Sequence, residues 1–197
     1  MTGARRRGRP RSGESVDRRA AILEAARRRF AARGFAGTTV RAIADDAGVD
    51  PSLVAHYFGN KQQLLVASLE LPVDPISKLA GVVQDGVDGL GERLVRTFVT
   101  SWDPHREVIA TMIRDAMAGN DTHSPITMVA RSVLIATVTG VLDGPDRDVR
   151  ADLIASQVIG LATLRYVVAV EPLASAPVDD VVRWYAPAIQ AVADDSR

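Results

Sequence analysis

The sequence predicts an all-α protein of about nine helices, in which a three-helix N-terminal domain with a helix-turn-helix precedes a larger C-terminal helical domain. Three observations lead to this fold class. Apolar residues recur at helical spacing along most of the 197 residues. The composition is rich in Ala, Val and Leu and only 5% aromatic, which suits an all-helical chain. We find no convincing strand pattern and no internal repeat.

The first 13 residues are polar, rich in glycine and basic, with five arginines. Such a segment buries too little apolar surface to fold alone, so residues 1–13 are predicted to be a disordered basic arm. The run from Arg7 to Pro10 resembles the core of an AT-hook, an extended element that places arginines in a narrow minor groove. The alternative, which we favour, is an arm whose arginines, Arg7 and Arg9 among them, contact phosphates without reading the sequence.

A first long helix is expected over residues 14–33. Its apolar stripe faces the domain core, and its many arginines form a mostly solvated face. The glycine that follows Arg33 is expected to end the helix and to let Phe35 fold back onto Phe30. The stripe consists of Ile22, Leu23, Ala26 and Phe30.

The stretch from Thr39 to Leu65 has the pattern of two short helices joined by a tight turn and followed by a third helix. Thr39 is an N-cap residue type, and the first short helix has one apolar face. Gly48 supplies a left-handed C-cap, after which Asp50 and Pro51 suit the N-cap and first position of the second helix. The apolar face consists of Val40, Ile43, Ala44 and Ala47. This stretch belongs to a predicted domain of residues 14–71.

The second short helix is predicted to expose small and polar residues, because its apolar residues can pack back on the helix before it. The third helix is expected to start near Lys61, where Asn60 and Gln63 form a pattern close to a capping box. An exposed helix of this kind fits the DNA major groove, where small and polar side chains approach phosphates and base edges. The outward set comprises Ser52, Ala55, His56, Tyr57 and Lys61. From periodicity alone, an ordinary helical hairpin with an exposed His-Tyr pair is the alternative.

The same stretch resembles the N-terminal domain of the TetR family of bacterial transcriptional repressors, over roughly residues 16–66. The matching motifs are Gly37-Thr38-Thr39-Val40, Ile43-Ala44, Ala47-Gly48-Val49, Tyr57-Phe58, Lys61 and Leu64-Leu65. We expect Thr39 and Lys61 to hold DNA phosphates, and Tyr57 to contact either phosphates or bases. The residues expected nearest the bases are Ser52, Ala55 and His56.

This chain departs from the family pattern at three places. The family often has Tyr where this chain has Ala55, and Lys-Gly or a similar pair where it has Pro51-Ser52. Pro72 and Pro75 interrupt the linking helix, which in the family is usually longer and unbroken. The break resembles a mostly actinobacterial subgroup with a proline-containing kink at this place.

The formal net charge of zero hides an uneven distribution. Residues 1–65 hold 13 Lys and Arg against 6 Asp and Glu, a balance of +7, and the other 132 residues hold 11 against 18, a balance of −7. A basic front and an acidic rear are typical of a DNA-binding domain joined to a regulatory domain. No apolar run reaches bilayer length and no secretory signal is found, so the expected compartment is the cytoplasm.

We expect neither an enzyme nor a metal or cofactor site. The chain has no cysteine for disulfides, thiolate chemistry or sulfur ligation. The three histidines, His56, His105 and His123, lie in no metal-ligand pattern, and the Walker and G-x-S-x-G motifs are absent.

Residues 72–197 are predicted to form a regulatory and dimerisation domain of five or six helices. Gly- and Pro-containing breaks separate these helices. Their expected spans are 75–86, 89–102, 104–118, 125–142, 147–170 and 178–194.

The last two expected helices form a candidate association surface. Apolar residues of the final helix recur at 4-3-4-3 spacing, which suits a seam for another helix, and the helix before it is apolar almost all round. The resemblance implies that these helices form a four-helix interface in a homodimer, which would bind a palindromic operator in double-stranded DNA. Packing within one chain is the alternative. The candidate interface residues are Leu161, Val168, Val178, Val182, Tyr185, Ile189 and Val192.

Bulky side chains on helices expected to face one another form a candidate effector pocket. By themselves, methionines and aromatic residues at helical spacing indicate plain core more often than a ligand site. The resemblance implies a ligand cavity in this region, and hence a small-molecule effector. The candidate lining residues are Phe98, Trp102, Met112, Met117, Met128, Leu134 and Tyr166. Asp103, His105, Arg131 and Arg165 are candidate polar groups, or alternatively surface charges and salt-bridge partners.

Together these features lead to one hypothesis: a homodimeric DNA-binding repressor that a small-molecule effector releases from a palindromic operator. The effector acts only through its differential affinity for the bound and released forms. The main alternative is a TetR-like activator or a ligand-independent DNA binder. A helical partner-binding module with a vestigial DNA head and, more distantly, an enzyme are alternatives of other classes.

Overall fold

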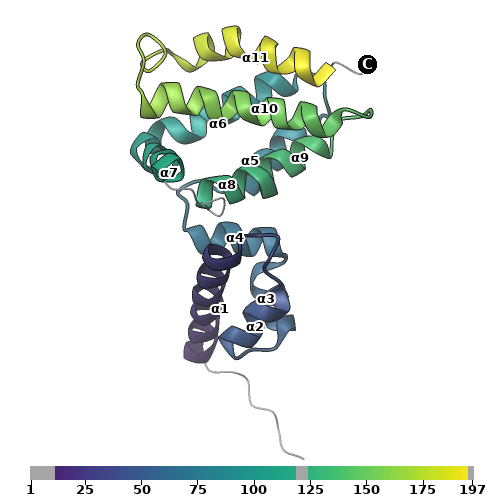
Figure 1. Cartoon of the computed structure of the whole chain (residues 1–197), viewed down its shortest axis with the longest axis vertical. Coiled ribbons are helices and arrows are strands. Elements are labelled where there is room, and N and C mark those ends of the chain that lie inside the picture. Colours follow the sequence, from purple (N-terminus) through teal and green to yellow (C-terminus); the bar gives the residue numbers. More distant parts are fainter. Residues whose placement is uncertain (1–11, 119–123, 195–197) are drawn as a thin grey trace, which may run out of the picture. The chain divides into compact units, whose positions relative to one another are not determined.

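The computed structural model describes residues 12–118 and 124–194, which are helical and contain no strand (Figure 1). These residues form two compact units, one that ends at Ser68 and one that begins at Leu69. The predicted basic arm, with Arg7 and Arg9, and also His123 lie outside the described residues. Within the described ranges, no helix combines the length and the apolar character that crossing a bilayer requires.

The N-terminal unit consists of four helices. They are α1 (Ser12–Arg33), α2 (Val40–Ala47), α3 (Pro51–Phe58) and α4 (Lys61–Leu69). α2 packs against both α1 and α3, and each of the four helices has buried apolar side chains. The central core residues are Ile22, Phe30, Ile43, Val54 and Leu64. The first long helix and the helix-turn-helix therefore lie where the sequence predicts them.

The end of α1 positions the chain for α2. Gly34 has φ of 65°, and its N–H donates to the carbonyl oxygen of Phe30 at 2.9 Å. The rings of Phe30 and Phe35 stack with their centroids 6.0 Å apart, which confirms the predicted fold-back. The buried hydroxyl of Thr38 donates to the carbonyl oxygen of Gly34 at 2.8 Å. This bond ties the residue just before Thr39 to the end of α1.

The C-terminal unit follows the predicted helical spans closely. Its first elements are α5 (Pro75–Val83), α6 (Leu90–Trp102), the 3-10 turn η1 (Asp103–His105) and α7 (Arg106–Ala118). They are followed by α8 (Pro125–Val129), the π-helical segment η2 (Ala130–Ile135) and α9 (Ala136–Thr139). The last are α10 (Arg147–Ala162), the π-helical segment η3 (Thr163–Val167) and α11 (Val178–Asp194). Figure 1 shows α10 and α11 side by side with α6 behind them.

Two of the predicted helices contain π-helical turns that the sequence does not indicate. The helix expected at 125–142 passes through η2, and the helix expected at 147–170 passes through η3 and ends at Val167. One extra residue in a turn shifts the apolar pattern by a single position, so periodicity does not reveal it.

α6 and α11 form the most extensive helix pair of the C-terminal unit and approach closely at Gly91. The backbone N–H of Gly91 donates to the side-chain oxygen of Gln190 at 2.9 Å. A Cβ at this position would lie 2.3 Å from the carbonyl oxygen of Ala186, which is far inside van der Waals contact. The absence of a side chain at Gly91 therefore permits this packing.

Candidate functional site

The caps of α2 and α3 define the geometry of the helix-turn-helix. The hydroxyl of Thr39 accepts the backbone N–H of Ala42 at 3.1 Å, and Gly48 ends α2 with φ of 66°. Asp50 caps α3 by accepting the backbone N–H of Ser52 at 2.8 Å, and Pro51 occupies the first position of that helix. Each of these caps is predicted from the sequence and confirmed by the structure.

α3 has one buried side and one exposed side. Val54 and Phe58 are buried in the core of the N-terminal unit, while Ser52, Ala55 and His56 are exposed. Tyr57 is half-buried, and its ring meets the ring of His56 edge-on with centroids 5.3 Å apart. The residues that the sequence assigns to DNA contact therefore lie on the solvent side of this helix.

Lys61 lies at the start of α4, behind the predicted capping box. Asn60 accepts the backbone N–H of Gln63 at 2.9 Å, and the side chain of Gln63 accepts the N–H of Asn60 at 3.1 Å. The ammonium of Lys61 lies 4.2 Å from the centre of the Phe35 ring, and its partial burial lowers the pKa of Lys61. A cation–π contact therefore holds this charge near the end of α3.

Two arginines of the N-terminal unit, Arg29 and Arg41, differ in whether they form an ion pair with an acidic side chain. Arg29 makes a bidentate ion pair with Asp46 at 2.5 and 2.7 Å, and these hydrogen bonds hold the pKa of Asp46 below its ordinary value. Arg41 is exposed in the first turn of α2 and has no charged partner among the described residues. Sequence reasoning did not single out Arg41, although its position two residues after Thr39 was a usable signal.

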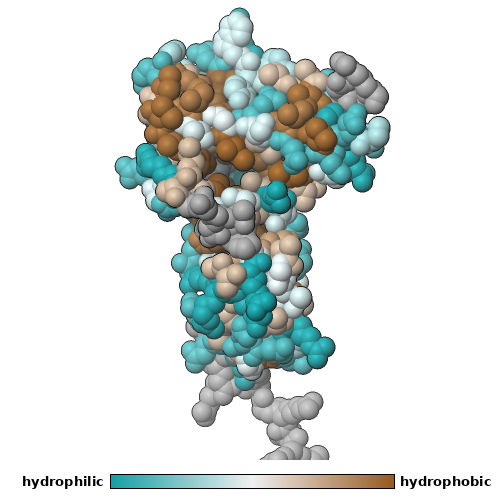
Figure 2. Space-filling model, viewed as in Figure 1, coloured by the Kyte–Doolittle hydropathy of each residue, from teal (hydrophilic) through white to brown (hydrophobic). Residues whose placement is uncertain are grey.

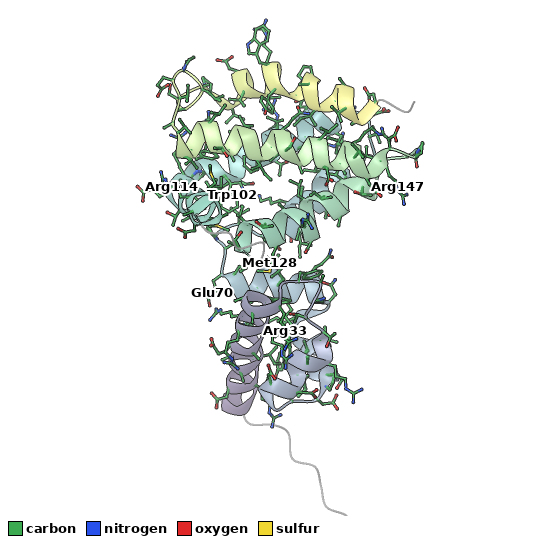
Figure 3. The ribbon with its side chains drawn as sticks, viewed as in Figure 1. Arg33, Glu70, Trp102, Arg114, Met128 and Arg147 are labelled. Atoms are coloured by element: carbon green, nitrogen blue, oxygen red, sulfur yellow. The ribbon has the colours of Figure 1, made fainter. Side chains whose placement is uncertain are left out.

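A second candidate site is a cavity of about 110 Å³ inside the C-terminal unit. Phe98, Trp102 and Leu134 of the predicted set line it, and Trp102 lies within this unit (Figure 3). Met112 and Tyr166 pack with Phe98 and Trp102 in the adjoining core cluster without lining the cavity. Lys78, Thr97 and Ser101 also line the cavity.

Two residues that were predicted to line the cavity, Met128 and Met117, lie elsewhere. Met128 is buried at 5% exposure but does not line the cavity, and Met117 is 70% exposed on α7. The prediction that Met117 lines the pocket is therefore wrong. Its spacing suited an inward face, but α7 turns this position to solvent near its end.

Two of the predicted polar groups, Asp103 and Arg165, form a network with Tyr166 beside the cavity. Arg165, only 3% exposed, donates to both carboxylate oxygens of Asp103 at 2.9 and 2.7 Å, and Tyr166 donates to Asp103 at 2.9 Å. Partial burial raises the pKa of Asp103, but the hydrogen bonds from Arg165 and Tyr166 outweigh it and hold the pKa below its ordinary value. Arg165 also donates to the carbonyl oxygens of Leu173 and Ala176. The network thus fixes the segment before α11, and Asp103 and Arg165 are salt-bridge partners.

The packing corrects three members of the predicted association set. Leu161, Val182 and Ile189 are only 1%, 6% and 0% exposed, because they are covered inside the single chain. The half-buried members of the predicted set are Val178, Tyr185 and Val192. Val168 remains open to solvent at 58% exposure. The 4-3-4-3 spacing correctly marks an apolar stripe, but it does not show whether the covering helix belongs to the same chain.

The C-terminal unit exposes a different set of apolar residues on α10, η3, α11 and the segment between η3 and α11. We call this set the exposed apolar surface; it consists of Val149, Leu153, Ile159, Leu164, Val168, Val170 and Trp184. Figure 2 shows hydrophobic residues gathered on the face of the C-terminal unit where α10 lies. Large exposed apolar patches mark interaction surfaces.

A helix-turn-helix whose second helix has a polar solvent face defines the class of helix-turn-helix DNA-binding proteins. A sequence profile described as "Bacterial regulatory proteins, tetR family" matches residues 22–68. Another, described as "Tetracyclin repressor-like, C-terminal domain", matches residues 88–192. The chain belongs to the TetR family, whose members are DNA-binding regulators of transcription and not enzymes.

Relatives with known names support this assignment. The HTH-type transcriptional repressor AcnR of Corynebacterium efficiens is 31% identical over 150 residues, which cover 66% of this chain and 80% of AcnR. The HTH-type transcriptional repressor SCO4008 of Streptomyces coelicolor is 28% identical over 136 residues, or 69% of each chain. The match to the HTH-type transcriptional regulator BetI of Rhizobium meliloti is 43% identical but spans only 60 residues, 30% of each chain.

Among solved structures, the TetR-family regulator SCO0857 of Streptomyces coelicolor A3 is 41% identical to this chain. The comparison covers 95% of this chain and 100% of the other, with a TM-score of 0.47. A TetR-like transcriptional regulator from Rhodococcus sp. RHA1 is 22% identical, with a TM-score of 0.46.

Proposed function

We propose that this regulator is a homodimeric repressor that binds a palindromic operator and leaves it when a small-molecule effector occupies the C-terminal cavity. The observation that carries the DNA-binding part is the exposed side of α3, which presents Ser52, Ala55 and His56 beyond a buried apolar side. A helix of this kind, held by a second helix, is the element that enters a major groove.

Within this proposal, Thr39, Lys61 and Arg41 contact phosphates. Thr39 is exposed at the N-terminus of α2, where the helix dipole favours an anion. Lys61 and Arg41 add positive charges near the two helices. Ser52 and His56 face base edges, Ala55 allows close approach, and Tyr57 contacts either phosphates or bases.

A second copy of the chain is the proposed occupant of the exposed apolar surface. Leu164, Val168 and Trp184 are 46%, 58% and 75% exposed, and covering such side chains stabilises association. Gly160 has nothing within 4 Å of where its Cβ would lie, so a helix of a partner can come close there. A dimer presents two copies of α3 to successive major grooves, which is what a palindromic operator requires.

The test is a footprint on the promoter region adjacent to the gene, followed by titration of the protected duplex. The proposal is supported if the footprint is two-fold symmetric, two chains bind each site, and rising salt weakens the binding. A binding curve with one chain per site, or no salt-dependent binding at all, refutes it. Increased transcription from a reporter carrying the same promoter would show an activator, the alternative within the same family.

A further inference from the structure

The walls of the C-terminal cavity are almost wholly apolar. Aliphatic and aromatic side chains from α5, α6, α7, η2 and α10 surround a space of about 110 Å³. Among the described lining residues, polar side-chain atoms come only from Lys78, Thr97, Ser101 and the indole of Trp102. A ligand held here exchanges water mainly for hydrocarbon, so its enclosed part must be apolar.

No carboxylate is available in the described lining to receive a cationic ligand. The acid next to Trp102 in sequence is Asp103, but both of its oxygens accept hydrogen bonds from Arg165 and one also accepts from Tyr166. An ammonium or guanidinium group in the cavity would lose its hydration without gaining a free anion. The cavity therefore disfavours cations.

The cavity is equally unfavourable for an anionic ligand. The only cation in the described lining is Lys78, and it is exposed. An exposed lysine covers apolar surface with its methylene chain while its ammonium stays in water. A carboxylate enclosed among the other lining residues would have to be buried without a charged partner.

Three groups on α6 are free to bind a neutral polar atom. Thr97, Ser101 and Trp102 line the cavity, and their hydroxyl and indole N–H groups make no hydrogen bond to another described residue. By contrast, the hydroxyl of Thr100, which does not line the cavity, donates to the carbonyl oxygen of Arg96 at 2.7 Å. A few polar groups beside an apolar space orient a ligand that replaces their water by a direct hydrogen bond.

We propose that the effector is an uncharged, mainly apolar molecule whose enclosed part is about the size of one six-membered ring, with one hydroxyl or carbonyl group directed at α6. The size follows from volume: an apolar cavity of roughly 150 Å³ accepts benzene, and the space of about 110 Å³ in this unit is of the same order. This inference rests on the proposed effector-responsive function and narrows it to one chemical class.

Phenol, benzoate and benzylammonium form a matched probe series with the same ring and a neutral, negative or positive group. Trp102 lines the cavity, so its fluorescence reports on ligand binding once the second tryptophan, Trp184, is replaced by Phe. Trp184 is 75% exposed and does not line the cavity. In the full-length Trp184→Phe protein, we expect phenol to bind at least tenfold more tightly than either ion. Equal or tighter binding of benzoate or benzylammonium overturns the proposal.

The hydroxyls on α6 are tested by the double variant Thr97→Val/Ser101→Ala, with Thr100→Val as the matched control. The double variant is expected to bind phenol about 3- to 10-fold more weakly, as for the loss of one or two hydrogen bonds, and to bind toluene unchanged. Thr100→Val is expected to bind both as the parent does. A double variant that binds phenol as tightly as the parent overturns the assignment of the polar contact.

Failure of this inference is distinguished from failure of the proposed function by measuring operator binding in parallel with the unsubstituted chain, because Trp184 belongs to the exposed apolar surface. Phenol that binds as described but leaves DNA affinity unchanged supports the ligand class and contradicts effector-driven release. An ionic compound that releases the operator through the cavity, with no binding of phenol or toluene, overturns the ligand class and leaves the repressor proposal standing.

Discussion

Ser52 donates its hydroxyl hydrogen to the carboxylate of Asp50 at 2.6 Å, in the first turn of α3. The same carboxylate oxygen accepts the backbone N–H of Ser52 at 2.8 Å, so one side chain both caps the helix and orients the hydroxyl. These hydrogen bonds from Ser52 hold the pKa of Asp50 below its ordinary value. A carboxylate can only accept hydrogen bonds, so the hydroxyl hydrogen of Ser52 is used in its bond to Asp50. Only the lone pairs of the Ser52 hydroxyl oxygen remain to bind DNA. We therefore expect Ser52 to accept a hydrogen bond from a base amino group, such as that of adenine or cytosine.

Replacing Ser52 by Ala is expected to reduce operator affinity about 3- to 10-fold, as for one lost hydrogen bond, while binding to unrelated duplex stays unchanged. The backbone N–H at position 52 can still donate to Asp50, so α3 keeps its cap. Fluorescence anisotropy with specific and unrelated duplexes measures both affinities. An equal loss on the two duplexes would show that Ser52 contacts the backbone and not a base.

Replacing Lys61 by Met is expected to weaken binding to all DNA sequences and to reduce the slope of log affinity against log salt by about 1. Met keeps an unbranched apolar side chain near the ring of Phe35, which lies 4.2 Å from the Lys61 ammonium, and removes only the charge. The same change in slope is expected for Arg41→Ala. Arg114→Ala, which removes an exposed charge from α7, serves as the control and should leave the slope unaltered. An unchanged slope in Lys61→Met would disprove the phosphate contact.

The helix-turn-helix was predictable residue by residue because its signals are local. Thr39, Gly48, Asp50 and the Asn60–Gln63 box each satisfy a nearby backbone group, and a local bond requires no knowledge of the rest of the fold. The capping residues alone therefore locate both short helices and the start of the third.

The faces of the last two helices were not predictable in the same way. Ile189 and Val182 have the spacing of an interface seam, yet α6, about 90 residues earlier in the chain, covers that side of α11. Hydrophobic periodicity identifies a stripe that must be covered, whereas the covering element is decided by tertiary packing. The Arg165–Asp103 pair, 62 residues apart, is likewise a non-local contact, which is why the sequence left its role open.

Replacing Leu164 by Glu is expected to convert the proposed dimer into monomers and to reduce operator affinity at least 100-fold, because each monomer then presents a single α3. Leu164 is 46% exposed, so the substitution leaves the core of the single chain intact. Val108→Glu is the matched control, since Val108 is 41% exposed on α7 and lies outside the exposed apolar surface. Sedimentation velocity measures the oligomeric state. Dimers that persist in Leu164→Glu would place the interface elsewhere.

Replacing Asp103 by Asn is expected to lower the free energy of unfolding of the C-terminal unit by roughly 3 kcal/mol, because a buried Arg165 loses its anion. Both tryptophans, Trp102 and Trp184, lie in this unit, so urea unfolding followed by fluorescence reports on it. The pKa of Asp103 is lower in the folded protein than its ordinary value of 3.8, so the stabilising contribution of its carboxylate is complete above that pH. It is lost as pH falls from 3.8 through the folded-state pKa.

The pH profile provides the check on that substitution. Wild-type protein is expected to lose stability more steeply than Asp103→Asn as the pH is lowered below about 4, because Asn does not titrate. Parallel profiles for the two proteins would mean that the carboxylate of Asp103 contributes no pH-dependent stability.

Replacing Gly91 by Ala is expected to destabilise the C-terminal unit by about 1–3 kcal/mol, the usual cost of forcing extra volume into a packed core. The new Cβ would lie 2.3 Å from the backbone oxygen of Ala186 and 2.9 Å from the backbone nitrogen of Gln190, so α11 must move away from α6 as a whole. Gly81→Ala is the control, because Gly81 lies on α5 with nothing within 4 Å of its Cβ position. That control is expected to raise stability by about 0.4–1 kcal/mol through the lower entropy of the unfolded chain. Urea unfolding measured by tryptophan fluorescence compares the two variants, and equal stabilities would contradict the close approach of α6 and α11.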